Sequence, residues 1–309
     1  MKQLLSGAVV LLLLAACESE RSRASTDSFF TDISLNVGLD FVHEAGEDSS
    51  FHMPEIGGAG VAFLDFDNDG DLDIYLVNGG FHADPSRRVA NRLYRQDDGR
   101  LIDVTAESGL GDTGYGMGVA VGDIDNDGFV DVYVSNHGLD ALYRNLGNGS
   151  FADITTHAGI ANPHWSSSVV MFDFNRDGLL DIYVTNYLRL DASVTCPDLA
   201  GRPDYCGPAS FDGLPDVLYE NLGDARFADV SVASGIAAPA SKGLGVVSAD
   251  FNGDLYPDLY VANDGEANHV WLNSGAGTFS DAAPRLGAAV NGLGLPEAGM
   301  GVALGDLED

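Results

Sequence analysis

The stretch DFDNDGDLD at residues 65–73 decides the fold, because three close copies of it follow along the chain. The copies read DIDNDGFVD at 123–131, DFNRDGLLD at 173–181 and DFNGDLYPD at 250–258, and a further copy begins with DLED at 306–309. Each complete loop carries oxygen-bearing side chains at positions 1, 3, 5 and 9, counted from its first Asp. Recurrence of one unit every 50–77 residues indicates a repeat architecture.

The oxygen side chains of these loops predict calcium binding, since Ca²⁺ takes six to eight oxygen ligands at about 2.3–2.6 Å. The loops are not EF-hands, because position 12 holds Leu or Val where an EF-hand has a bidentate Glu. We expect about one structural Ca²⁺ per complete loop, with the Asp at position 9 as the bidentate ligand; regulatory and catalytic roles are the alternatives. The predicted ligands are Asp65, Asp67, Asp69, Asp71, Asp73, Asp123, Asp125, Asp127, Asp131, Asp173, Asn175, Asp177, Asp181, Asp250, Asn252, Asp254 and Asp258.

The fourth loop departs from the pattern at position 6, where Leu255 replaces the Gly of the other three loops. Its Gly253 stands at position 4 instead. Loops three and four also carry Asn175 and Asn252 at position 3, which lowers the ligand charge. We therefore expect calcium affinity to fall from loop one to loop four.

Short apolar and β-branched runs flank every loop and predict strands rather than helices. Each unit then contains four strands, of which the third has the core LYRN or a variant and the fourth follows a Gly-containing turn. First strands are expected at 61–64, 119–122, 169–172 and 246–249, and second strands at 74–78, 132–136, 182–186 and 259–263. Third strands are expected at 92–96, 141–145, 217–221 and 270–273, and fourth strands at 101–105, 151–155, 227–231 and 279–283.

Four antiparallel strands per repeat predict an all-β fold, a β-propeller with four-stranded antiparallel blades over residues 29–309. Residues 29–39 resemble a fourth strand without its first three, and 302–305 resemble a first strand without its successors. We therefore expect about four blades plus partial first and last strands, in a chain truncated at its C-terminus. The longer third unit predicts a loop insertion at 187–215 on one face of the propeller.

The N-terminus predicts an exported lipoprotein. Residues 1–17 combine a charged start, a short apolar run and the ending LAAC, which is typical of a lipoprotein signal peptide with Cys17 as the lipidated residue. An ordinary secretory signal is the alternative. The polar residues 18–28 predict a flexible tether. The expected location is the bacterial outer membrane or cell surface, with the periplasm or secretion as alternatives.

The remaining cysteines, Cys196 and Cys206, lie in the insertion and predict a disulfide, as expected of an exported protein. The formal net charge of −32 argues against nucleic acid as a partner. The seven His residues show no metal-ligand spacing, and no catalytic constellation is visible.

The unit GVAxxDxDxDGxxDxYVxN…LYRNxGxGxFxDVTxxAGI resembles the FG-GAP/VCBS repeats of integrin α-subunit propellers. It is most similar to bacterial exported proteins of the cartilage acidic protein type, which often carry an ASPIC/UnbV segment. The resemblance covers residues 29–309. It implies a seven-bladed calcium propeller in the full-length protein and names no ligand.

Two functions remain open. The first is a non-enzymatic adhesion or interaction module, anchored to the membrane through Cys17, that binds an extracellular or periplasmic protein or polysaccharide. The second is a carbohydrate-active enzyme, a lyase or a hydrolase, on a propeller scaffold. A lyase site for an acidic sugar needs basic residues, and the chain has only 15 Lys and Arg. We therefore favour the interaction module.

Overall fold

The structure of the protein, a computed structural model, describes residues 30–46, 51–80 and 84–305. The signal peptide 1–17 with Cys17, the tether 18–28 and the start of the fifth loop at 306–309 lie outside the described residues. The chain divides into two units, residues 1–34 and 35–309. All the strands of the described chain belong to the second unit.

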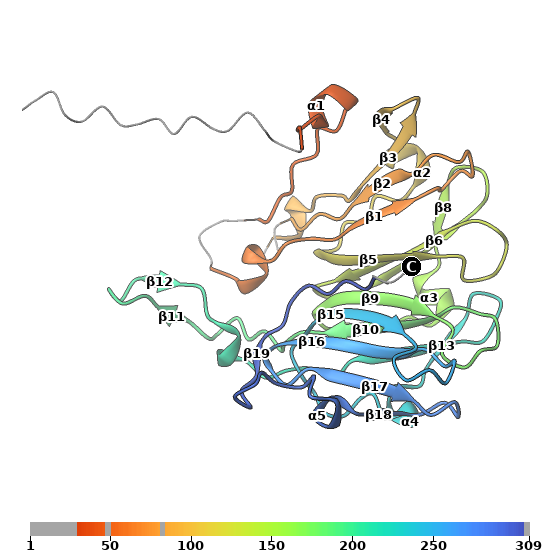
Figure 1. Ribbon diagram of the computed structural model, residues 1–309. Coiled ribbons are helices and arrows are strands. Elements are labelled where there is room, and N and C mark those ends of the chain that lie inside the picture. The colour runs from red at the N-terminus through yellow and green to blue at the C-terminus, as the bar shows by residue number, and fades with distance from the viewer. Residues whose placement is uncertain (1–29, 47–50, 81–83, 306–309) are drawn as a thin grey trace, which may run out of the picture. The chain divides into compact units, whose positions relative to one another are not determined.

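Four antiparallel sheets make up the body of the described chain, each built on four strands taken in sequence order, and the last of them has a short fifth strand (Figure 1). The first sheet comprises β1 (Val61–Leu64), β2 (Asp73–Leu76), β3 (Arg92–Asp97) and β4 (Arg100–Asp103), and the second β5 (Gly116–Gly122), β6 (Asp131–Asn136), β7 (Ala141–Asn145) and β8 (Phe151–Asp153). The third comprises β9 (Ser166–Phe172), β10 (Asp181–Asn186), β13 (Val217–Asn221) and β14 (Phe227–Asp229), and the fourth β15 (Gly243–Ala249), β16 (Asp258–Glu266), β17 (His269–Asn273) and β18 (Phe279–Asp281). The predicted all-β class and the predicted four strands per repeat are confirmed.

Each sheet can pack against a neighbour on both of its faces, because successive residues of a strand point to opposite sides of the sheet. In β6, Val132 and Val134 pack in one cluster with Tyr75 of the first sheet. Tyr133, between them in sequence, packs in a second cluster with Ile182 of the third sheet. A third cluster joins the third and fourth sheets. The first strands β1, β5, β9 and β15 lie side by side in this order (Figure 1). That these sheets are blades of a closed propeller stays a prediction.

The fourth strands end earlier than predicted, and a short helical turn follows each of them. These turns are α2 (Thr105–Ser108), α3 (Thr155–Ala158), α4 (Ser231–Ser234) and α5 (Ala283–Leu286). In the second repeat, the Asp153 side chain accepts the backbone N–H of Thr155 at 2.9 Å, which ends the strand and starts the turn. Gly159 then ends the turn with φ +82°, a left-handed conformation that favours Gly.

The two partial strands expected at the chain ends do not form among the described residues. Residues 30–33 are not a strand, and the turn α1 (Ser34–Val37) follows them as α2 to α5 follow the fourth strands. Residues 302–305 are likewise irregular. Here β19 (Glu297–Ala298) pairs with the end of β16 instead. A strand requires a neighbour that pairs with its backbone N–H and C=O groups, and neither segment has one in the described chain.

The insertion 187–215 lies between β10 and β13 and carries the short hairpin β11 (Cys196–Pro197) and β12 (Pro203–Asp204), followed by the 3-10 turn η3 (Pro208–Ser210). Cys196 and Cys206 form the predicted disulfide, with an S–S distance of 2.13 Å. Two further 3-10 turns, η1 (Met53–Ile56) and η2 (Pro85–Arg87), lie outside the sheets. None of the helices in the part of the chain that the structure describes is long and apolar enough to span a bilayer.

Candidate metal centre

Each acidic loop forms the turn between the first and second strands of its sheet, and the position-1 Asp organises that turn. In loop one, the backbone N–H groups of Asp69 and Gly70 donate to the two carboxylate oxygens of Asp65, at 3.1 and 3.0 Å. Loops two to four repeat both bonds at 2.8–3.2 Å, around Asp123, Asp173 and Asp250. The four loops therefore share one backbone conformation.

The position-9 Asp is fully buried in every loop, at Asp73, Asp131, Asp181 and Asp258. One oxygen accepts the N–H of loop position 2 and the other an N–H of the third strand. Burial raises the pKa of Asp73 to about 6 and those of Asp131 and Asp181 to about 7, and it also raises the pKa of Asp258. Each oxygen keeps a second lone pair that a cation can use.

Loop position 6 takes a left-handed conformation, which explains the Gly found there in loops one to three at φ between +89° and +93°. Leu255 takes the same region in loop four, at φ +73°. Its N–H still donates to Asp250 at 2.8 Å, so the loop keeps its shape. A side chain in this conformation costs about 1–2 kcal/mol. The lower calcium affinity expected for loop four stays a prediction.

The structure brings the carboxylates at positions 1, 3 and 9 together in the first two loops. Oxygens of Asp65, Asp67 and Asp73 lie within 4.8 Å of one another, as do those of Asp123, Asp125 and Asp131. The other predicted acidic ligands of these two loops, Asp69, Asp71 and Asp127, are not in these groups. Loops three and four place an Asn at position 3, whose amide oxygen is also a calcium ligand type.

One buried atom of loop one indicates that these residues fit a cation. The Oδ1 atom of Asp67 is buried and has no hydrogen-bond partner. Burial raises the pKa of Asp67, and the charges of Asp69 and Asp65 add to that rise. An unpaired carboxylate oxygen among other carboxylates is costly, and a bound cation removes that cost. The donor set, all hard oxygens, fits Ca²⁺.

Neighbouring loops contact one another through position 4. The side-chain amide of Asn68 donates to the carbonyl of Gly128 in loop two at 2.9 Å, and that of Asn126 donates to Gly178 in loop three at 3.0 Å. In loop three, the guanidinium of Arg176 lies 5.4 Å from the ring centre of Tyr256 in loop four. The loops therefore form a continuous row along one edge of the stacked sheets.

A second set of links, which the sequence analysis missed, comes from the Asn that ends the third strand. Its side chain donates to the carbonyl at loop position 2 of the preceding repeat. These bonds run from Asn145 to Phe66, from Asn221 to Ile124 and from Asn273 to Phe174, at 2.8–2.9 Å. The signal was visible in the sequence, because three of the four LYRN-type cores end in Asn.

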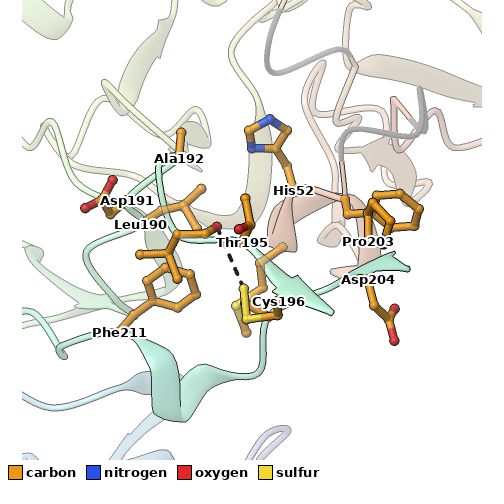
Figure 2. A pocket seen from close by; sticks show the side chains of 13 residues that line it. His52, Leu190, Asp191, Ala192, Thr195, Cys196, Pro203, Asp204 and Phe211 are labelled. Atoms are coloured by element: carbon orange, nitrogen blue, oxygen red, sulfur yellow. Dashed lines mark hydrogen bonds between the residues drawn. A yellow bond between two sulfur atoms is a disulfide. The ribbon is translucent and has the colours of Figure 1, made fainter. Parts of the chain in front are cut away.

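The insertion forms a pocket with the segment that precedes β1. Figure 2 shows His52 from that segment and Cys196 and Phe211 from the insertion lining the same pocket. The pocket is small, about 100 Å³. The ring of Phe51 packs edge-on against Tyr205, whose hydroxyl donates to Glu55 at 3.0 Å. The insertion is thus fixed at its base.

A known relative matches over about two thirds of the chain. Cartilage acidic protein 1 of Homo sapiens is 23% identical over 218 residues, which cover 69% of this chain and 31% of that protein. This chain therefore spans less than a third of the length of that relative.

Two solved structures show weak likeness. One is an Agrocybe aegerita lectin that recognises non-reducing terminal N-acetylglucosamine, at 17% identity and a TM-score of 0.29, covering 71% of this chain and 64% of the lectin. The other is the V. cholerae biofilm matrix protein Bap1, at 15% identity and a TM-score of 0.35, covering 72% of this chain and 30% of Bap1. These scores are too low to transfer a binding property.

The model of the FG-GAP-like repeat matches residues 65–134, 127–184 and 250–308. All four complete acidic loops lie inside these matches. The resemblance read from the repeat unit is thereby confirmed. Because the matches cover more than half of the chain, it belongs to the family of FG-GAP-like repeat proteins.

Proposed function

We propose that this protein is an exported, calcium-binding repeat protein that acts as a non-enzymatic interaction module. The buried, unpartnered Oδ1 of Asp67 among the carboxylates of loop one carries the calcium part of the proposal. The disulfide supports export, since such bonds persist in oxidising compartments. The leader at 1–17 supplies the route, with Cys17 as the lipid anchor and 18–28 as the tether.

Calcium has a structural role in this proposal. Predicted ligands crowd each hairpin turn, and the turns touch one another along the stack. A cation in each loop neutralises that repulsion and fixes the turn. The metal therefore stabilises each sheet and the packing between repeats, which we take to be propeller blades.

Thermal unfolding of the purified protein in calcium and in chelator tests this role. We expect the midpoint to rise with calcium concentration, because binding to the folded state alone adds about 2.7 kcal/mol at 100 times the dissociation constant. Magnesium at the same concentration is the control, and its effect should be smaller because Mg²⁺ sheds its water reluctantly. Equal midpoints in calcium and chelator would refute the calcium proposal.

The insertion 187–215 is the proposed contact surface for a protein or glycan partner. Its hairpin β11–β12 ends in an exposed turn, where the Leu199 side chain is fully exposed. The disulfide at the base of the hairpin fixes the turn that carries Leu199, and an exposed turn of fixed shape suits contact with a partner.

Binding of the protein to a panel of immobilised polysaccharides and matrix proteins tests this surface. Leu199→Asp should lose the binding that the wild type shows. The matched control is Leu293→Asp, at another exposed Leu outside the insertion, which should bind as the wild type does. A Leu199→Asp variant that binds normally would move the contact surface away from the insertion.

A further inference from the structure

One position of the third strand lies beside the acidic loop of its own sheet in three of the repeats. It precedes the residue that ends the LYRN-type core. The residue there varies with loop position 3: it is Arg where position 3 is Asp, and Glu or Leu where position 3 is Asn. The four residues are Arg95, Arg144, Glu220 and Leu272.

In loop two this residue covers predicted calcium ligands. Nε of Arg144 lies 2.6 Å from Oδ2 of Asp125, and Nη2 lies 3.1 Å from Oδ2 of Asp127. The Asp125 side chain is 11% exposed, so this carboxylate is largely shielded from solvent, while the Arg144 side chain is 40% exposed. A guanidinium and a calcium ion cannot both sit on the Asp125 oxygen, because their charges repel at that distance.

Loop one offers an internal comparison with the same residue type. Arg95 pairs with Asp97 of its own strand, at 2.7 Å from Nη2 and 3.1 Å from Nε. The Oδ1 atom of Asp67, at position 3, keeps no hydrogen-bond partner. The position-3 carboxylate is therefore covered by an arginine in loop two, and in loop one it keeps a buried oxygen for a cation.

In the third repeat, this third-strand position holds the negatively charged Glu220. Oε1 of Glu220 lies 3.3 Å from Nδ2 of Asn175, so its carboxylate reaches the position-3 side chain. It restores the negative charge that Asn175 lacks relative to Asp67 and Asp125. Leu272 of the fourth repeat offers neither charge to its loop.

We propose that this third-strand position sets the calcium affinity of each loop. Arg144 is a resident cation that calcium must displace from loop two, and Glu220 supplies the carboxylate that loop three lacks at position 3. The inference rests on the calcium binding proposed above. It changes the expected order of affinities, since loop two becomes weaker and loop three stronger than their loop sequences alone predict.

Arg144→Leu tests the proposed role of Arg144. It gives the second repeat the residue type found in the fourth. The midpoint in chelator should fall, because Asp125 and Asp127 lose their counter-ion. The midpoint rise caused by calcium should grow, with affinity at loop two up about 10-fold in calorimetric titration. A merely structural arginine would lower both midpoints together. The control is Arg92→Leu, which removes an arginine paired with Asp103 and leaves the calcium response unchanged.

Glu220→Gln tests the proposed role of Glu220. It also tests the proposal by itself if the Arg144→Leu protein does not fold. The calcium-induced rise should shrink, while the midpoint in chelator should stay or increase. A wild type that responds to calcium, with variants whose response is unchanged, would overturn this inference and leave the calcium proposal standing. A wild type that does not respond would overturn both.

Discussion

Four buried aspartates, one at position 9 of each loop, close the hairpins by accepting two backbone N–H groups apiece. The sequence analysis predicted them as bidentate metal ligands. The structure shows that they also hold the loop to the third strand. A substitution at Asp131, for example, would break the hairpin and the predicted metal site together. A substitution at position 3 separates metal binding from hairpin closure better, because Oδ1 of Asp67 has no hydrogen-bond partner.

Asp67→Asn should weaken calcium binding and stabilise the calcium-free protein. The substitution removes the negative charge of a carboxylate that has one buried oxygen without a hydrogen-bond partner, and Asn at position 3 already occurs in loops three and four. We expect the midpoint in chelator to rise by the equivalent of about 1 kcal/mol and the rise caused by calcium to shrink.

The matched control for this change is Asp98→Asn, an exposed Asp in the turn between β3 and β4 of the same sheet that is not a predicted ligand. It should leave the calcium response close to that of the wild type. A calcium response that is the same in Asp67→Asn and in the wild type would exclude Asp67 as a ligand.

At the scale of the single element, the sequence predicted the second and third strands to within a few residues. Alternating apolar residues and the position of the acidic loop specify these strands locally. The fourth strands were predicted too long, because the apolar residues of segments such as 151–155 favour a strand while the Asp153 side chain ends it. The first strands begin up to three residues earlier than predicted, at Gly-rich or Ser-rich positions such as 116–118 that carry no strand signal.

The sequence shows the recurring Asn of these links between repeats but not the carbonyl that it contacts, because the two residues lie far apart in sequence. Nδ2 of Asn145 donates to the carbonyl of Phe66, 79 residues away, and to that of Val130 in its own loop. Its Oδ1 accepts the N–H of Gly147 at 3.0 Å. The buried Asn145 amide thus forms hydrogen bonds with backbone groups of two repeats.

Asn145→Ala should destabilise the protein by about 2–4 kcal/mol, because it leaves the buried carbonyls and one N–H without their partner. Chemical denaturation measures this loss. Asn148→Ala, three residues along in an exposed turn, is the control and should cost about 1 kcal/mol or less. Equal losses in the two variants would mean that the link between repeats adds nothing to stability.

At the scale of the whole molecule, the sequence predicted repeated sheets of four strands, since every repeat carries the complete pattern. It was wrong about strands in the described residues 30–39 and 302–305, for which a local pattern was not enough. The same sequence features form a strand in the middle repeats, where a neighbouring strand pairs with them, and remain irregular where the described chain provides none. Strand formation in this chain depends on tertiary pairing rather than on composition alone.

The asparagine links also bear on how such a chain can lengthen or shorten during evolution. Each one joins a side chain of one repeat to a main-chain carbonyl of the repeat before it, and every residue type has that carbonyl. A duplicated repeat therefore contains the Asn donor, and the repeat before it already has the backbone carbonyl that accepts. Gain or loss of a whole repeat leaves this hydrogen bond between neighbouring repeats in place. The number of repeats can therefore change while the sequence of each repeat stays constrained.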